Sequence, residues 1–168
     1  MTAAAPRPAV RPARLEDAPA LGAIDHATWT WLSSPSPRPA EPRPFFDERT
    51  RPEDVVVAEL TPGGRVAGYV KLGHPTPLES NRHVLMVNGL AVDPELQGRG
   101  LGRVLLDGAV AEARARGARK LALRVLSENA PARALYRRFG FVEEGVLREE
   151  FLLDGRYVDD VFMALFLR

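Results

Sequence analysis

The feature that most constrains the fold is a glycine-rich stretch, Gly98-Arg99-Gly100-Leu101-Gly102, between an apolar run and a helical pattern. Residues 84–92 are apolar and β-branched, which predicts a strand that Asp93-Pro94 ends. From Leu101 onward, apolar residues recur every three or four positions, as in an amphipathic helix. Alternate glycines let the backbone turn sharply and let a ligand approach closely, and the helix start offers unpaired N–H groups. We therefore expect an anion site here, and phosphate suits it best.

Two common phosphate motifs do not match this stretch. The dinucleotide-binding fingerprint requires a third glycine where this chain has Arg103, and an acidic residue near Leu121-Ala122-Leu123. The P-loop requires Lys and then Ser or Thr after its last glycine, and neither follows Gly102.

Composition narrows the class of protein. The 168 residues carry a formal net charge of +1, which argues against nucleic-acid binding by bulk charge. Without cysteine there can be no disulfide, thiolate metal site or thiol nucleophile, and the three histidines lack metal-ligand spacing. No apolar run is long enough to span a membrane, and the first residues lack the pattern of a secretory signal. We expect a cytoplasmic protein that needs no metal and binds neither membranes nor nucleic acids, while a homodimer stays open.

Strand and helix patterns alternate along the chain. Residues 1–9 are predicted to be a flexible tail and residues 10–168 a single domain. We expect an α/β (α+β) fold with a mixed sheet of about seven strands and about four helices. Predicted strands cover residues 10–13, 55–60, 65–72, 84–92, 120–126, 141–147, 149–153 and 157–167, with turns at 61–64 and 154–155. Predicted helices begin near residue 15, at 101 (ending at Gly117) and after the N-cap Asn129 (ending at Gly140).

Two motifs resemble the GNAT N-acyltransferase superfamily. Gln97-x-x-Gly100-x-Gly102 resembles its Gln/Arg-x-x-Gly-x-Gly/Ala signature. The stretch from Ser127-Glu128-Asn129 to Phe139-Gly140-Phe141 resembles the segment that follows. The motifs occur in the family's order over residues 84–141. Arg82-His83-Val84 and the segment from Glu144-Gly145 to Tyr157-Val158-Asp159 resemble a bacterial branch of small-molecule and amino-acid acetyltransferases.

The resemblance implies the GNAT fold, with a bulged strand 84–92 that splays from strand 120–126 in a V. It implies acetyl-CoA as cofactor, with its pyrophosphate on the glycine loop and its pantetheine between the splayed strands, next to the Leu90 and Val92 amides. Asn129 would contact the pantetheine, and Tyr136 would be the general acid. The implied cofactor-binding residues are Leu90, Ala91, Val92, Gln97, Gly98, Arg99, Gly100, Leu101, Gly102, Arg103, Asn129, Ala132 and Tyr136.

Acetyl transfer to an amine requires a neutral amine, a polarised carbonyl and a proton for the leaving thiolate. A phenol of pKa ~10 can protonate a thiolate whose thiol has a pKa of ~8.5 when the geometry is favourable. For the general base the candidates are His83, Glu41, Glu48 and Asp159, or a water chain through Asn88.

The proline-rich segment 29–54 carries Trp29, Trp31, Phe45 and Phe46. These rings either pack on the sheet or line an acceptor pocket for an amine with an apolar group. The final hairpin, near Tyr157 and Asp159, is the other acceptor site considered.

We expect an acetyl-CoA-dependent N-acetyltransferase that acts on the primary amine of a small molecule (amino acid, polyamine or drug-like amine) by direct attack in a ternary complex. The alternatives are a protein or ribosomal-protein N-terminal acetyltransferase and a catalytically silent CoA-binding module. The sequence does not identify the acceptor.

Overall fold

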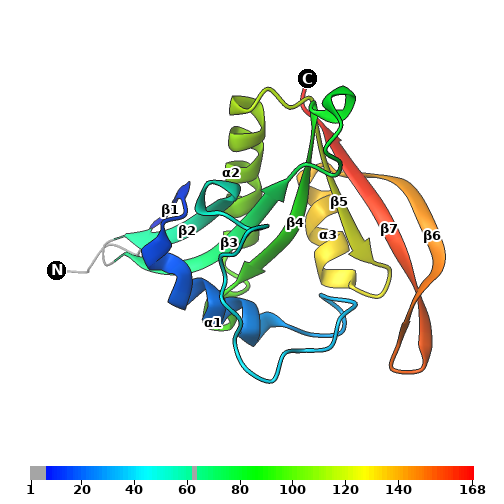
Figure 1. Cartoon of the computed structure of the whole chain (residues 1–168), viewed down its shortest axis with the longest axis horizontal. Helices are drawn as coiled ribbons and strands as arrows, with labels where there is room; N and C mark the ends of the chain where they lie inside the picture. Colours follow the sequence, from blue (N-terminus) through cyan, green and yellow to red (C-terminus); the bar gives the residue numbers. More distant parts are fainter. Residues whose placement is uncertain (1–6, 62–63) are drawn as a thin grey trace.

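One seven-stranded sheet forms the centre of the computed structural model, which describes residues 7–61 and 64–168 (Figure 1). The strand order is β1-β2-β3-β4-β5-β7-β6, and only the β4–β5 pair is parallel. The strands are β1 (Arg7–Pro12), β2 (Val55–Thr61), β3 (Arg65–Gly73), β4 (Val84–Val92), β5 (Lys120–Leu126), β6 (Val142–Leu153) and β7 (Arg156–Phe166). This mixed sheet confirms the predicted fold class.

The described residues form three α-helices, whereas about four helices were predicted. They are α1 (Ala18–Thr28), α2 (Leu101–Ala115) and α3 (Ala130–Phe139). Four single-turn 3₁₀ helices complete the secondary structure: η1 (Leu15–Asp17), η2 (Pro52–Asp54), η3 (Glu79–Asn81) and η4 (Pro94–Leu96). Prolines keep the segment between α1 and η2 free of regular structure, as predicted. None of the helices in the described ranges is both long and apolar enough to cross a bilayer.

Helices cover the two faces of the sheet unequally. The main core joins Leu105 of α2 and Tyr136 of α3 to inward-facing strand residues such as Leu85 and Leu123. On the opposite face, Leu21 and Ile24 of α1 pack on β2 and β3 with Phe45. Figure 1 shows α1 on one side of the sheet and α2 and α3 on the other. On the α1 side, none of the helices in the described residues covers β5, β7 and β6 (Figure 1), so a ligand can reach that part of the sheet.

The two central strands separate part-way along their length. The β4–β5 ladder runs only from Val84–Lys120 to Val87–Leu123, although β4 stays paired with β3 up to Val92. The β3–β4 register shifts near Lys71, because Asn88 is an extra residue that forms a bulge in β4. The bulge turns β4 away from β5, and both the bulge and the splay were predicted.

Two predicted boundaries were wrong. The first strand begins at Arg7, so residues 7–9, assigned to the tail, pair with β2 instead. Strands 141–147 and 149–153 are one strand, β6, because a bulge lets pairing with β7 resume beyond it. In this bulge Glu149 takes a left-handed φ of 51°, and its N–H donates to the Asp159 carboxylate (2.8 Å). The predicted turn at 61–64 includes residues 62–63, which lie outside the described residues.

Candidate active site

The glycine loop that leads into α2 leaves its backbone accessible. Gly98 and Gly100 adopt positive φ values of 76° and 80°, and a side chain at either position would point into open space. Leu101 and Gly102 are in the first turn of α2, where helical geometry provides no acceptor for their N–H groups. A Cβ at position 102 would lie 3.0 Å from the Leu135 side chain on α3, so a side chain there would require Leu135 to shift. The loop therefore presents free amides beside the positive end of a helix dipole.

Side chains brace this loop and add charge to it. Gln97 donates through Nε2 to the Val92 carbonyl (3.2 Å), which ties the loop to the end of β4. The Arg103 guanidinium lies 5.6 Å from the centre of the Phe139 ring, and Arg99 is exposed beside the loop. A groove of about 580 Å³, which we call the loop groove, runs from Gln97, the loop glycines and Arg103 to Asn129 and Ala132.

The edge of β4 beyond the splay has unpaired amides. The Asp93 N–H donates to the Ala67 carbonyl (2.8 Å), so it points toward β3. Successive amides of a strand alternate in direction, so those of Leu90 and Val92 point the other way, into the gap beside β5. Leu90, Ala91 and Val92 all line the loop groove, which suits an extended ligand that pairs with β4 like an added strand.

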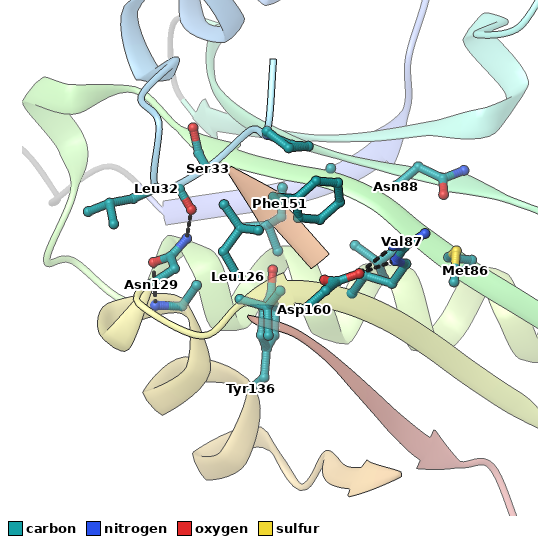
Figure 2. Close-up of a pocket in the computed structure, with 16 residues that line it drawn as sticks. Leu32, Ser33, Met86, Val87, Asn88, Leu126, Asn129, Tyr136, Phe151 and Asp160 are labelled. Atoms are coloured by element: carbon teal, nitrogen blue, oxygen red, sulfur yellow. Dashed lines mark hydrogen bonds and ion pairs between the residues drawn. The ribbon is translucent and has the colours of Figure 1, made fainter. Parts of the chain in front are cut away.

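Asn129 caps α3 and also fastens a loop. Its Oδ1 accepts from the Ala132 N–H (3.3 Å), and Pro131 follows in the first turn, as predicted. Its Nδ2 donates to the Leu32 carbonyl (3.0 Å), which holds the segment after α1 over the site (Figure 2). One amide hydrogen of Asn129 is left for a ligand.

Tyr136 lies on α3 with its ring in the core and its hydroxyl in a cavity. Only 8% of the residue is exposed, and the ring packs against Phe141 at 5.7 Å. Burial raises the pKa of the phenol to about 12, so it keeps its proton throughout the physiological range. Figure 2 shows the hydroxyl pointing toward the space between Leu126 and Asp160.

This central cavity, of about 350 Å³, lies where β4 and β5 separate. It shares Leu90, Asn129 and Ala132 with the loop groove, so the two spaces meet. Its other walls come from the segment after α1, from β5, and from the β6–β7 hairpin. They include Leu32, Ser33, Pro35, Met86, Asn88, Arg124, Leu126, Phe151 and Asp160.

A side chamber of about 270 Å³ lies across β4 from the central cavity and shares Ser33, Asn88, Gly89 and Leu90 with it. The Tyr69 hydroxyl in this chamber donates to the Asp25 carboxylate, and burial raises the pKa of this hydroxyl far above its usual value. Lys71 lies 3.8 Å from Asp25.

The other predicted residues lie at different distances from these spaces. Trp29 lines the side chamber, and its Nε1 donates to the Ser36 carbonyl (3.0 Å). Phe45 is buried against Tyr69 and Phe46 packs on Phe45, both outside the three spaces. Trp31, His83 and Tyr157 are exposed and line none of the three, and neither does Asp159, which binds the Glu149 N–H.

Sequence reasoning missed Arg124, Asp160 and Phe151 in the central cavity and the Asp25–Tyr69 pair in the side chamber. A charged residue inside an apolar strand was the available signal for Arg124 and Asp160. Among the described residues, no three His, Cys, Asp or Glu side chains are grouped to hold a metal ion.

Comparison with known protein families matches residues 22–141 to the acetyltransferase (GNAT) family. The chain belongs to this family. It is accordingly an acyltransferase, and the fold, bulge and splay described above are those the resemblance implied.

Three proteins illustrate the similarity. The L-methionine sulfoximine/L-methionine sulfone acetyltransferase of Pseudomonas aeruginosa is 29% identical over 161 residues, covering 93% of this chain and 92% of that protein. The [ribosomal protein bS18]-alanine N-acetyltransferase of Escherichia coli is 44% identical over 77 residues, 45% of this chain and 51% of that protein. The structure of yncA from Salmonella typhimurium with its cofactor acetyl-CoA has a TM-score of 0.74 and 24% identity, covering 96% of this chain and 95% of that one. At 24% identity, this neighbour shows that the fold is shared.

Proposed function

We propose that the protein transfers the acetyl group of acetyl-CoA to the primary amine of a small molecule by direct attack in a ternary complex. The observation that carries the proposal is the position of the Tyr136 hydroxyl. The hydroxyl enters the central cavity from the face of the sheet that α2 and α3 cover. Other cavity walls lie on the opposite face, where the segment after α1 contributes Leu32, Ser33 and Pro35. An acid and an acceptor can thus approach one thioester from opposite sides.

The residues present fit the cofactor. The amides from Gly98 to Gly102 would hold the pyrophosphate, while the Arg103 N–H already donates to the Gly100 carbonyl (3.1 Å). The Arg99 and Arg103 side chains would add charge. The Leu90 and Val92 amides and the Asn129 side chain would hold the pantetheine, as the unpaired β4 edge suggests. Acetyl-CoA supplies the activated acetyl group as a thioester.

The chain's own groups then account for each proton and charge. The amine lone pair forms the new C–N bond while the Leu90 amide, beside the bulge, stabilises the negative oxygen. As the C–S bond breaks, the Tyr136 hydroxyl gives its proton to the thiolate. His83 lies outside the cavity, so we assign the base to no side chain. The amine enters neutral, and its surplus proton leaves through water beside the exposed Asn88. Water then returns a proton to the Tyr136 phenolate, which restores the starting state.

The acceptor in this proposal is a small molecule. The relative aligned over most of its length is named for a small amino-acid analogue, and the cavity volume suits such a ligand. The hydrogen bond from Asn129 to Leu32 also holds the segment after α1 over the cavity, which leaves less room for a peptide acceptor to enter. A protein α-amine is the second candidate, because the bS18-alanine acetyltransferase matches the region of the cofactor motifs.

The test is release of CoA thiol from acetyl-CoA with amino acids, polyamines, aminoglycosides and short peptides, with each product identified by mass. We expect thiol release that depends on a small amine and yields the N-acetylated amine. Acetylation of peptides alone would select the second candidate, and no amine-dependent release with any class would contradict the proposal.

A further inference from the structure

A charged pair lies in the central cavity, where apolar strands would otherwise be expected. Asp160 of β7 is only 3% exposed. It accepts from the Arg124 Nε at 2.5 Å and also pairs with Nη2. Both residues line the cavity that receives the Tyr136 hydroxyl (Figure 2).

The position of Arg124 follows from the splay. The β4–β5 ladder ends at Val87–Leu123, so Asn88 and Arg124 are the first residues beyond the last pair. Val87 and Leu123 belong to the core on the helix side, and neighbouring side chains of a strand alternate between faces. Arg124 therefore lies on the face opposite α2 and α3, at the point where the strands open. This is the face from which an acceptor would approach.

Stability alone gives little reason to keep this pair. Burying the Asp160 carboxylate costs desolvation that its attraction to the partly exposed Arg124 roughly offsets, and apolar replacements of such pairs are often neutral or stabilising. The neighbours two positions away on the same face are apolar, Ala122 and Leu126 on β5 and Val158 and Phe162 on β7, so an apolar pair would fit here. A charge kept at the mouth of a reaction cavity suggests that it binds a ligand.

The guanidinium still has donors to offer. Its Nε and Nη2 face Asp160, and Nη1 donates to no residue in the described ranges. The Arg124 side chain is 42% exposed and lies 5.0 Å from the centre of the Phe162 ring. The Nε–Nη2 edge of the guanidinium pairs with Asp160, and Phe162 lies near the group, so the Nη1 side remains available to a ligand. Arginine binds a carboxylate through such donors in a planar arrangement.

We propose that Arg124 binds the carboxylate of an α-amino-acid acceptor and that Asp160 is the positioning residue that holds the guanidinium. This inference rests on the proposed N-acetyltransferase function and specifies its substrate class. In an α-amino acid one carbon separates the carboxylate from the amine, so a carboxylate held at the mouth of the splay places the amine at the thioester. Leu32, Pro35 and Phe151 form an apolar wall in the same cavity, which favours an apolar side chain on the acceptor.

A second cation, Lys71, is the alternative site for that carboxylate. Its ammonium lies 4.4 Å from the centre of the Phe45 ring and 3.8 Å from the Asp25 carboxylate. These partners already face its charge, and Lys71 lines the side chamber but not the central cavity. It therefore serves as a matched control for Arg124.

The experiment compares apolar α-amino acids, such as methionine and leucine, with their carboxamides, which keep the amine and side chain but lack the charge. For each pair kcat/KM is expressed per neutral amine. The variant is Arg124→Gln with Asp160→Asn, because Arg124→Gln alone would leave a buried carboxylate without its cation. Arg124→Lys, which keeps the charge but loses the planar fork, is the second variant, and thermal melting verifies that each is folded.

We expect the wild-type protein to prefer the acid over the carboxamide by on the order of 10²-fold, the effect of a charge-assisted pair. In the double variant this preference should disappear through a higher KM for the acid, with kcat/KM for the carboxamide within about 3-fold of wild type. Arg124→Lys should reduce the preference about 10-fold, and Lys71→Gln should leave it intact.

Equal use of acid and carboxamide by the wild-type protein would overturn the inference. A preference that survives in both Arg124 variants, or one that Lys71→Gln abolishes, would overturn it as well. These results differ from failure of the proposed function, in which no amine of any class would release CoA thiol. If carboxamides, alkylamines or peptides were acetylated and α-amino acids were not, the result would refute only the proposed role of Arg124.

Discussion

Tyr136 combines an apolar position with an acidic task. Burial destabilises the phenolate and so raises the pKa of the hydroxyl, to about 12. The leaving thiol has a pKa of ~8.5, so the tyrosine is fully protonated whenever a thiolate forms. The thiolate is a weaker base than the buried phenolate, so this proton transfer is uphill and depends on close contact between the hydroxyl and the sulfur as the C–S bond breaks. The surroundings of Tyr136 thus keep the acid protonated but also make it a weaker acid.

Replacing Tyr136 by Phe keeps the ring and removes the proton. We expect turnover to fall by ~10²-fold, the low end for general acid catalysis, with the acetyl-CoA affinity largely unchanged. Steady-state kinetics and calorimetric titration measure the two quantities. Tyr157→Phe is the matched control, since that tyrosine is 65% exposed and lines none of the three spaces. Turnover of Tyr136→Phe within a factor of ~3 of wild type would mean that Tyr136 is not a significant acid.

The pH dependence of kcat/KM follows from the same pKa. The fraction of neutral amine rises with pH, so kcat/KM should rise until the amine is deprotonated. Tyr136 acts in its protonated form, and because its pKa is raised, the loss of activity from its ionisation should begin only near pH 12. A profile of kcat/KM from pH 6 to 11 should therefore rise and then level off. A fall with an apparent pKa near 10 that is absent in Tyr136→Phe would contradict this account.

The sequence revealed some of these residues and not others. Tyr136 and Asn129 follow from a motif, because the motif reflects local helix geometry and the cofactor contact that the family resemblance implies. Arg124 and Asp160 meet only because β5 pairs with β7, which places Leu126 opposite Asp160 across some 34 positions of chain. No local pattern encodes that pairing. Phe45 illustrates the reverse case, since composition alone could not tell a core ring from a pocket wall, and the structure buries it against Tyr69.

Among the elements, the loop before α2 has the strictest conformational requirement. Gly100 is the N-cap of α2 with φ at 80°, a conformation that most side chains disfavour. Asn and Asp both tolerate this conformation and have nearly the same shape. Substituting one or the other therefore separates backbone strain from charge.

Gly100→Asp should abolish detectable acetyl-CoA binding, because a carboxylate would stand in the phosphate site. Gly100→Asn should weaken binding by about 10-fold at most, as a single uncharged obstruction. Calorimetric titration of both variants with acetyl-CoA measures the difference. Equal affinities for Asp and Asn would show that no anion binds there, and unchanged affinity in Gly100→Asp would remove the pyrophosphate from this loop.

The central and final strands differ in how far local signals predicted them. The boundaries of β4 and β5 follow from runs of apolar residues bounded by proline and glycine, and both strands were found where expected. The β6 strand was predicted as two strands, because polar residues around Glu149 interrupt the pattern. Its continuity depends on the bulge at Glu149, which the Asp159 carboxylate of β7 holds in place. A bulge stabilised by a neighbouring strand has no signature within its own segment.

In the whole molecule, the sheet separates the two halves of the reaction. Tyr136 and the core helices lie on one face, while the central cavity opens on the face that no helix covers beside β5 and β7. The order of the elements along the chain was predictable from periodicity and turn residues. The placement of β7 between β5 and β6 was not, because strand order depends on contacts between distant segments. That placement brings Asp160 and Phe151 to the cavity.

In the proposed mechanism, the acetyl group passes directly from the thioester to the amine across the gap between β4 and β5. The most direct test combines initial rates, with acetyl-CoA and the amine both varied, and the intact mass of the protein after incubation with acetyl-CoA alone. We expect intersecting double-reciprocal lines and an unmodified protein mass, because direct transfer forms no acetylated protein. Parallel lines together with a protein that has gained the mass of one acetyl group would contradict direct transfer.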